Sequence, residues 1–556
     1  MMTQHALHPR LHFETVREVV TWAGKTHGEK IAYSYREKAS DKEILKVSFI
    51  GLQKDVEALT NTLVNMGCTG KHCAVVGKLS YRWALVYFAV LSAGGVLVPL
   101  DKDWNGEDLA HTAREGEVKF LFCDSDLKDK AEAIAAATAL EADPVYLDSE
   151  GFWSLLSAGR NSRPPLPRID PLAPALLVYT SGTTGAGKGV LLSQTAIISN
   201  ITAALPYIDY SEKTVGVLPP HHTYGSTVMF LGHAIIGSEV YISAGLRHIQ
   251  RELKEQKPGH LVLVPLYLET FYRKIQSTVK EQKKEKLLSR MMAVSGGLRK
   301  VGIDLRKRMF ASLREAFGGE IKTVICGGAP INGEIISFFE AIGISTLNGY
   351  GITECAPLIA VNRSRCVVPD SVGHVIDVDT VKILSPDANG EGEILVKGPN
   401  VMLGYYKNPQ ATAEAIDSEG YFHTGDYGKL NEDGVLFITG RKKNLIILSN
   451  GKNVYPEEIE NHLIALPGVL EVIVYEGKSK RGSEHDAIVA EIYPDPEYCK
   501  KNGIQDTTAF LKTHLDAYNR TATPYKRVAK LKVRSAEFPK NTLRKIRRFE
   551  LDMTID

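Results

Sequence analysis

The chain has 556 residues, a formal net charge of +2 and 24% charged residues. This length predicts at least two domains, and the nearly balanced charge gives no indication of a nucleic-acid partner. The seven cysteines form no C-x-x-C pair and no zinc-like spacing with histidine, so we expect neither a disulfide framework nor a structural metal. A reducing, cytoplasmic location is therefore expected.

The first long apolar stretch, residues 83–100 (WALVYFAVLSAGGVLVPL), is eighteen residues without a charge, which is the lower limit for a membrane span. Gly94, Gly95 and Pro99 interrupt it, so we predict a buried helix followed by a buried strand and no transmembrane segment. The N-terminus lacks a cationic region followed by an apolar run, and no signal peptide is predicted. Peripheral contact with a membrane stays open.

Short β-rich runs alternate with helical patterns through the first part of the chain: HCAVVG, VKFLFCD, ALLVYTSG, LVLVP and KTVICGG. This alternation predicts the α/β class, with parallel sheets covered by helices. Two charge-rich helical patterns, LRHIQRELKEQKPG and YRKIQSTVKEQKKEKLLSRM, are typical of solvated outer faces. From about Asp377, the turn signals DANGEGE and NEDG predict a small antiparallel, β-barrel-like region. After Arg441 the pattern is mixed, which predicts a small α+β C-terminal domain.

The loop SGTTGAGKGV, residues 181–190, comes within one residue of a P-loop. Gly182, Gly187 and Lys188 satisfy G-x-x-x-x-G-K, but Gly189 stands where the P-loop needs Ser or Thr to hold Mg²⁺. A P-loop opens directly into a helix, whereas a strand-like run, GVLLSQ, follows Lys188. We therefore predict another kind of phosphate-binding loop, in which backbone N–H groups, hydroxyls and the lysine converge on phosphate oxygens.

Four further motifs follow this loop in order: NGYGITE (348–354), YFHTGD (421–426), GRKKN (440–444) and FPKNTLRK (538–545). The ordered set resembles the adenylate-forming superfamily, which comprises acyl- and aryl-CoA synthetases, adenylation domains of peptide synthetases and firefly luciferase. The resemblance extends from the N-terminal region to Lys545. It implies that ATP and Mg²⁺ activate a carboxylic acid to an acyl-AMP with release of pyrophosphate, and that the acyl group then passes to coenzyme A.

Several roles follow from the residue types as well as from the resemblance. Tyr350 offers an aromatic face for adenine, Thr353 a hydroxyl for phosphate, and Glu354 a hard oxygen ligand for Mg²⁺. Asp426 can accept hydrogen bonds from ribose hydroxyls, and Arg441 can donate to ribose or phosphate.

The resemblance completes the predicted site. The catalytic residues are Lys545, His222, Lys188, Thr353 and Glu354, and the metal ligands are Glu354 and Thr184. The cofactor-binding residues are Thr180, Ser181, Gly182, Thr183, Thr184, Gly185, Lys188, Gly328, Ala329, Asn348, Gly349, Tyr350, Gly351, Thr353, Asp426, Arg441, Gly451 and Lys545.

Two positions depart from the family pattern around Lys545: Asn541 replaces Thr and Arg544 replaces Gly. Lys545 keeps its spacing from Pro539, so its predicted role, bridging carboxylate and phosphate, is retained. The resemblance implies a domain of residues 1–442 and a mobile domain of residues 443–556 that rotates about Lys443. After rotation, Gly451 is expected to lie beside the pantetheine of coenzyme A.

The segments around GGAPINGEIISFFEAIGISTLNGYGITE and SNGKNVYPEEIE look most like bacterial long-chain fatty acyl-CoA synthetases. We expect the acyl pocket around residues 222–229 and 351–359. Three alternatives stay open: an aryl- or short-acid CoA ligase, a freestanding enzyme that loads an acyl carrier protein, and a nucleotide- or acyl-binding protein without turnover.

Overall fold

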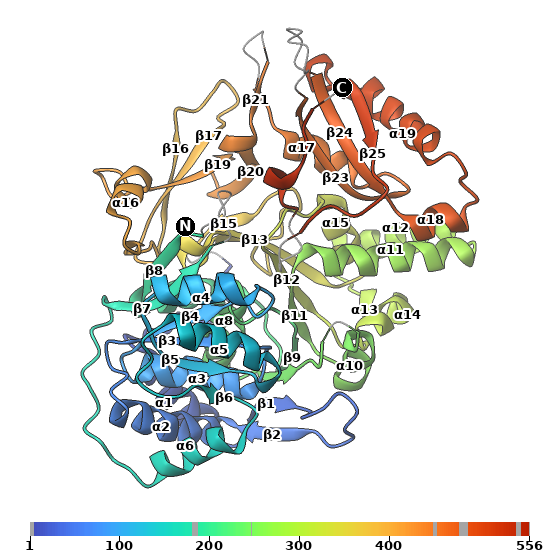
Figure 1. Ribbon diagram of the computed structural model, residues 1–556. Coiled ribbons are helices and arrows are strands. Elements are labelled where there is room, and N and C mark those ends of the chain that lie inside the picture. Colours follow the sequence, from blue (N-terminus) through green and yellow to red (C-terminus); the bar gives the residue numbers. More distant parts are fainter. Residues whose placement is uncertain are drawn as a thin grey trace.

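A seven-stranded sheet organises the N-terminal part of the computed structural model (Figure 1). The structure describes residues 5–180, 187–245, 247–448, 453–477, 487–540 and 546–554. The strands lie in the order β18 (Gly404–Tyr405), β8 (Gly189–Ser193), β7 (Pro174–Tyr179), β4 (Val96–Leu100), β3 (His72–Val76), β5 (Val118–Cys123) and β6 (Val145–Tyr146). The helices of this region are α1 (Val16–His27), α2 (Phe49–Asn65), α3 (Tyr81–Ser92), α4 (Gly106–Glu115), α5 (Lys128–Ala137), α6 (Glu150–Arg160) and α7 (Gln194–Ala204).

The uncharged stretch 83–100 forms most of α3 and all of β4. The Ser80 side chain caps α3 by accepting a hydrogen bond from the Trp83 N–H, and Gly94 follows the helix with a φ of +72°. Both elements are buried, and this confirms the predicted helix followed by a strand. None of the helices in the described ranges is long and apolar enough to cross a membrane.

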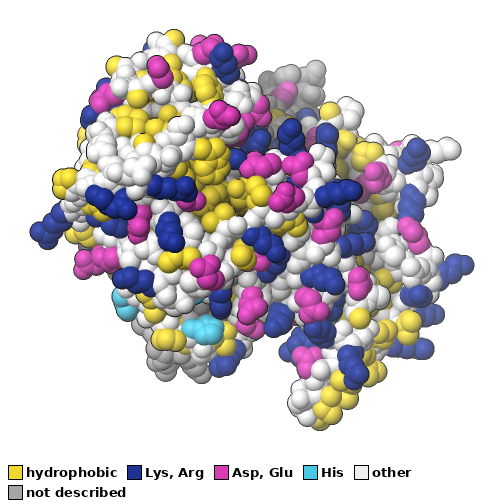
Figure 2. Space-filling view, turned by 90° about the horizontal axis from the view of Figure 1, so that it is seen from below, with side chains coloured by type: hydrophobic (Ala, Val, Ile, Leu, Met, Phe, Trp, Pro, Cys, Tyr) yellow, Lys and Arg dark blue, Asp and Glu magenta, His cyan; other side chains and the backbone are white. Residues whose placement is uncertain are grey.

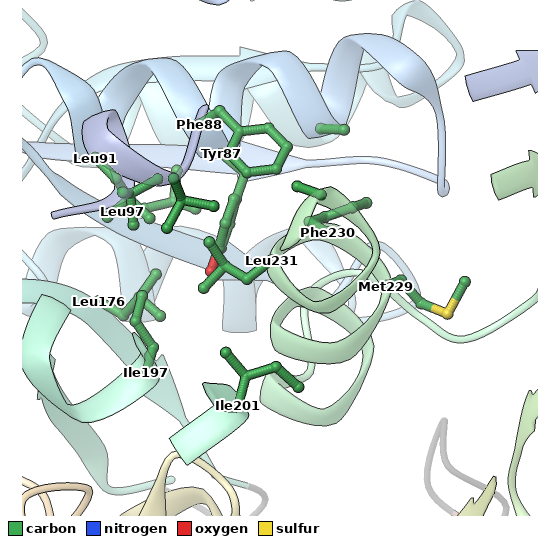
Figure 3. Packing of buried hydrophobic residues seen from close by; sticks show 14 of the residues in the cluster. Tyr87, Phe88, Leu91, Leu97, Leu176, Ile197, Ile201, Met229, Phe230 and Leu231 are labelled. Atoms are coloured by element: carbon green, nitrogen blue, oxygen red, sulfur yellow. The ribbon is translucent and has the colours of Figure 1, made fainter. Parts of the chain in front are cut away.

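The main core packs α3, β4 and β7 against α7 and the π-helix η3 (Thr227–Gly232), as Figure 3 shows. Phe230 is fully buried, and its ring centroid lies 5.3 Å from that of Tyr87. Ile201 of α7 and Met229 of η3 belong to the same cluster. Close packing of this kind holds α7 and η3 in fixed positions beside the cavity described below.

A nine-stranded sheet follows the first one along the chain. Its order is β11 (His260–Leu263), β12 (Thr323–Gly327), β13 (Ser345–Gly351), β14 (Leu358–Val361), β15 (Gly373–Val375), β20 (Val435–Arg441), β19 (Phe422–Leu430), β17 (Gly392–Lys397) and β16 (Thr380–Leu384). The first three strands are parallel and the rest antiparallel. The predicted α/β class is confirmed. The predicted antiparallel region belongs to the same sheet as the parallel strands, because β14 and β15 connect β13 to β20.

A four-stranded sheet completes the large domain, in the order β2 (Leu45–Ser48), β1 (Ile31–Tyr35), β10 (Glu239–Ile242) and β9 (Lys213–Gly216). The remaining helices of the large domain are α8 (Thr223–Ser226), α9 (His233–Ile236), α10 (Ile249–Gln256), α11 (Pro265–Glu281), α12 (Glu285–Lys300), α13 (Arg306–Met309), α14 (Ala311–Arg314), α15 (Gly333–Ala341) and α16 (Pro409–Ala415).

The C-terminal part lies above α11 and α15 in Figure 1. Its sheet is β23 (Val469–Gly477), β24 (Ala487–Pro494) and β25 (Lys530–Val533), with β21 (Ile446–Ile447) and β22 (Asn453–Val454) pairing separately; its helices are α17 (Pro456–Leu463), α18 (Pro496–Lys501) and α19 (Thr507–Thr521). Two hydrophobic clusters contain only residues from Ile446 onward. Asn332 donates a hydrogen bond to the Asn461 carbonyl, and Lys501 donates one to Ser277, across to the large domain.

Gly159→Ala should destabilise the packing of α6 on α2. A Cβ at this position would lie 1.8 Å from the Ala58 carbonyl oxygen, so the two helices would have to separate. We expect a cost of about 1–3 kcal/mol, measured as a lower thermal midpoint. Gly151→Ala is the control in the same helix, because its Cβ would meet no atom closer than Ser149 Oγ at 3.3 Å. Equal losses in both variants would contradict this account.

Candidate active site

A cavity of about 1650 Å³ opens where the two large sheets meet the C-terminal part. Every predicted site residue within the described ranges lines it: Thr180, Lys188, His222, Gly328, Ala329, Asn348, Gly349, Tyr350, Gly351, Thr353, Glu354, Asp426 and Arg441. Ser181, Gly182, Thr183, Thr184, Gly185, Gly451 and Lys545 lie outside the described residues. Residues that are hundreds of positions apart in the sequence therefore face one space.

The phosphate-loop segment joins two antiparallel strands, β7 and β8. The Thr180 N–H donates to the Lys188 carbonyl, and β8 begins directly after Lys188. This confirms the predicted strand and distinguishes the loop from a P-loop, which would continue as a helix. A Cβ at Gly187 would lie 2.1 Å from the Thr180 carbonyl oxygen, so the close approach of these two backbone segments requires glycine here.

Two neighbouring strand ends supply the residues predicted to contact the nucleotide. β12 leads into Gly328 and Ala329, while β13 carries Asn348, Gly349 and Tyr350. These strands are parallel, so their carboxyl ends lie at the same edge of the sheet. The Asn348 side chain donates to the Ser371 carbonyl, which holds it at the cavity wall.

Asp426, Arg441 and Tyr350 form one polar cluster, in which Asp426 is buried and Arg441 is exposed. Asp426 on β19 lies opposite Arg441 on β20, with 3.0 Å between Oδ1 and the arginine Nε. The Tyr350 hydroxyl donates to the other oxygen, Oδ2, at 2.6 Å. Burial and the nearby carboxylate raise the pKa of Tyr350, so it stays a protonated donor, and Asp426 raises the pKa of Arg441. The cluster therefore presents a fixed carboxylate and guanidinium to the cavity.

Lys188 and Glu354 are connected through a residue that sequence reasoning missed, Tyr405 of β18. The Lys188 ammonium lies 4.5 Å from the centre of the Tyr405 ring, and the Tyr405 hydroxyl donates to Glu354 Oε1 at 2.9 Å. Burial raises the pKa of Tyr405, which keeps it a donor. The sequence of this short strand, Gly-Tyr, does not indicate a role at the site. Tyr405 reaches the site only because β18 pairs with β8.

His222 caps the first turn of α8, and its Nδ1 accepts a hydrogen bond from the Tyr224 N–H at 3.3 Å. Neutral His222 therefore carries its proton on Nε2 and can donate through that atom. Its neighbour His221 also lines the cavity, with Nε2 3.5 Å from Asp101 Oδ2, and burial lowers the pKa of His221.

Two asparagine amides hold the loop that follows Glu354, and neither was predicted. The Asn200 side-chain amide of α7 donates to the carbonyls of Cys355 and Leu358, and its Oδ1 accepts from the Leu358 N–H. The Asn400 amide donates to the same two carbonyls. We call this arrangement the amide clamp. It fixes the backbone that carries Glu354.

Asp379 supports the clamp, since Asn400 also donates to Asp379 Oδ2 at 3.1 Å. Burial raises the pKa of Asp379 to about 8. The second oxygens of both groups, Asp379 Oδ1 and Asn400 Oδ1, are buried and have no hydrogen-bond partner among the residues that the structure describes. A protonated Asp379 would supply a donor at this place, in keeping with the raised pKa of the carboxyl.

Asp379→Asn should flatten the pH dependence of stability. Because the pKa of Asp379 lies above its ordinary value, its contribution is fully present below about pH 4 and is lost as the pH rises toward 8. The variant cannot ionise and should remove a slope of up to about 1.4 kcal/mol per pH unit. Thermal midpoints between these pH values measure it, with exposed Asp433→Asn as the control. An unchanged slope in Asp379→Asn would show that the carboxyl is ionised in the folded chain.

Described residues on both sides of Lys545 also line the cavity. Lys540 and Ile546 form an antiparallel β-bridge and so hold the ends of the intervening segment together. Glu457 and Glu460 of α17 line the cavity as well. The C-terminal part therefore faces the same space as Glu354 and Asp426.

Comparison with known proteins places this site in a family. Residues 20–406 match the model of the family described as AMP-binding enzyme. The long-chain-fatty-acid–CoA ligase FadD15 of Mycobacterium bovis is 29% identical over 473 residues, which cover 80% of this chain and 76% of the relative. A long-chain-fatty-acid–[acyl-carrier-protein] ligase, AEE15 of Arabidopsis thaliana, is 26% identical over 79% of this chain and 71% of its own length.

The fold has solved counterparts. The crystal structure of ATP-bound MatB from Rhodopseudomonas palustris superposes with a TM-score of 0.76 at 24% identity and covers 96% of this chain and 97% of that one. The predicted α/β architecture of the adenylate-forming enzymes is thus confirmed. The chain belongs to the AMP-binding enzyme family, the adenylate-forming enzymes that its motifs resemble.

Proposed function

We propose that this chain activates a medium- or long-chain fatty acid with ATP and transfers the acyl group to coenzyme A. The observation that carries the proposal is that one cavity is lined by a charged group of residues, which we call its charged end, and by an apolar group, its apolar end. The charged end contains Lys188, Glu354, Asp426 and Arg441. Residues of the apolar end come from α7, α8, η3, β12 and the neighbouring loops: Ile201, Ala204, Ile208, Tyr224, Val228, Val264 and Ile325.

The apolar end supports a hydrocarbon substrate. Its side chains belong to the main hydrophobic cluster or pack against it, so the wall continues the protein core. Apolar surface of this kind favours a methylene chain over a charged or hydrated acid. The similarity to long-chain-fatty-acid ligases points to the same class of acid.

In the first half-reaction, a carboxylate oxygen of the acid attacks the α-phosphorus of ATP, and the bond from that phosphorus to pyrophosphate breaks. Two anions must approach each other, so cationic and N–H donors have to neutralise the charge. We assign this role to Lys188, to Arg441 and to the Nε2–H of His222. Tyr350 and Asp426 hold the adenosine, so that the reacting atoms meet in a fixed orientation.

Mg²⁺ is the ion that this mechanism implies. Among the described residues, no group of three or more His, Cys, Asp or Glu side chains could hold a metal by itself. One carboxylate, Glu354, fits an ion that takes most of its ligands from water and phosphate oxygens. Bound there, Mg²⁺ would neutralise phosphate charge, with Thr184 as the further predicted ligand.

In the second half-reaction, the thiolate of coenzyme A attacks the acyl carbon and AMP leaves. We propose that residues 443–556 rotate about Lys443 between the two steps, so that Lys545 serves the first step and Gly451 borders the thiol in the second. The position of Lys540 and Ile546 at the cavity supports a role for Lys545 in adenylation. A cytoplasmic location stays a prediction.

Mass spectrometry of the products formed from ATP, Mg²⁺, coenzyme A and a mixture of acids tests the function. We expect long-chain acyl-CoA as the main product. Aryl- or short-chain acyl-CoA would overturn the substrate assignment. Acyl-AMP without acyl-CoA, together with acylation of an added holo-carrier protein, would identify a carrier-protein ligase instead. ATP binding without acid-dependent pyrophosphate release would identify a binding protein.

Lys545→Ala separates the half-reactions. It should lower acid-dependent pyrophosphate release by at least about a hundredfold, because it removes a charge that acts in that step. Thioester formation from supplied acyl-AMP should stay within a few-fold of the wild type. Lys512→Ala, on the outer helix α19, is the control and should leave both rates unchanged. Equal losses in both half-reactions of Lys545→Ala would refute the assignment of Lys545 to the adenylation step alone.

A further inference from the structure

Helix α12 has an outer face that is exposed in the part of the chain that the structure describes. Ser295 is the only fully buried residue among its sixteen, and Leu288, Met291 and Met292 are the side chains that pack inward. On the outside, Leu287 is 51% exposed and Val294 57%, while Val301, which follows the last helical residue, is 71% exposed. Three large apolar side chains exposed to water along one helix and its C-terminal end need an explanation.

The exposed apolar residues are spaced by seven positions: 287, 294 and 301. Seven residues make nearly two helical turns, so the side chains form one stripe along the outer face. Gly297 lies one helical turn from Val294 and adds no bulk that would keep a flat surface away. Ile303 and Leu305, just beyond the helix, are exposed as well.

Positive charge borders the stripe. Arg290 lies one helical turn after Leu287, Lys286 lies one turn before Arg290, and Lys283 stands in the turn just before the helix. Residues 280–308 contain ten Lys or Arg and three Asp or Glu, a net charge of +7, whereas the whole chain carries +2. The rest of the chain is therefore net negative by 5, so this segment is more basic than the chain as a whole.

Most of these cations form no ion pair with a residue that the structure describes. Among the ion pairs of the described residues, none involves Lys283, Lys284, Lys286, Arg290, Arg299 or Lys300. The acids of the segment are mostly engaged: Glu281 pairs with Lys501, and Asp304 with Arg306. Figure 2 keeps the right-hand side of Figure 1 on its right, where α11 to α14 lie, and shows many Lys and Arg side chains there, with hydrophobic ones between them.

We infer that Lys283, Lys286, Leu287, Arg290, Val294 and Val301, which we call the basic apolar face, dock the protein on an anionic lipid bilayer. An apolar stripe bordered by Lys and Arg is the composition of a helix that lies in the plane of a membrane interface. The apolar side chains enter the acyl boundary and the cations meet anionic headgroups. A protein partner would need a shaped counter-surface, whereas a bilayer needs only this straight stripe with positive charge beside it.

The position of α12 gives the contact a use. α12 packs against α11, and the first turn of α11 contains Pro265 and Leu266, which line the cavity. Leu266 is itself partly exposed. The docked face is therefore on the helical hairpin that borders the cavity, and a water-insoluble acid would be released from the bilayer beside it. The docking itself does not depend on the proposed function.

Vesicle flotation of the full chain, without ATP or acid, tests the inference. We expect binding to vesicles of phosphatidylcholine and phosphatidylglycerol in equal parts, and weak binding to phosphatidylcholine alone. The triple variant Lys283→Gln, Lys286→Gln and Arg290→Gln should lose about fivefold in affinity for each charge removed, about a hundredfold in total. High salt should weaken wild-type binding, because the Debye length falls from about 10 Å at 0.1 M to about 3 Å at 1 M.

The double variant Val294→Ser and Val301→Ser should bind anionic vesicles about tenfold more weakly. Leu166→Ser with Leu172→Ser is the matched control, since both leucines are exposed on another surface. Thermal midpoints check that all variants fold. Absence of wild-type binding to anionic vesicles, equal binding to neutral ones, or an equal loss in the control would overturn the inference. So would a dimer that dissociates in the Val294→Ser, Val301→Ser variant, or an acidic carrier protein that binds this face while vesicles do not.

Discussion

The amide clamp is the constraint on which the rest of the site depends. Asn200 and Asn400 come from different elements, yet both donate to the carbonyls of Cys355 and Leu358. A buried carbonyl without a donor is costly, so the loop stays where both amides reach it. Glu354 lies directly before this loop, and Tyr405 holds its carboxylate from a third direction. The metal-ligand candidate is thus fixed by contacts from three parts of the fold.

The clamp also explains how two sheets form one cavity. α7 directly follows β8 and packs against the seven-stranded sheet. The clamped loop, in contrast, joins β13 to β14 of the nine-stranded sheet. Holding the loop against α7 brings Lys188, at the start of β8, toward Glu354 through the ring of Tyr405. The continuous ladder from β13 through β20 and β19 then places Asp426 beside Tyr350. The charged groups are preorganised by the scaffold before any substrate arrives.

Much of this could be predicted because local patterns decide it. The buried helix and strand of residues 83–100, the strand after Lys188 and the turns around Asp377–Val435 follow from apolar periodicity and turn residues. The site residues came from the ordered motifs and from their resemblance to the adenylate-forming superfamily. Asn200 could not be found in this way, since one asparagine in the apolar pattern SQTAIISNITAAL does not tell which carbonyls it will meet. The role of Tyr405 depends on the pairing of β18 with β8. The joining of the parallel and antiparallel strands into one sheet depends in the same way on the pairing of β14, β15 and β20. The charge-rich segment of α12 was interpreted as a solvated face, because charge density hides an apolar stripe until exposure is known.

Acid-dependent exchange of pyrophosphate into ATP, measured over a range of Mg²⁺ concentrations, tests the central claim that the clamp holds Glu354 for the adenylation step. The wild type should require a carboxylic acid for exchange. Asn200→Ala, if its thermal midpoint shows a folded chain, should need at least about tenfold more Mg²⁺ for half-maximal exchange, because an outer contact of the metal-ligand loop is lost. Exchange without any acid, or an unchanged Mg²⁺ requirement in folded Asn200→Ala, would contradict the account.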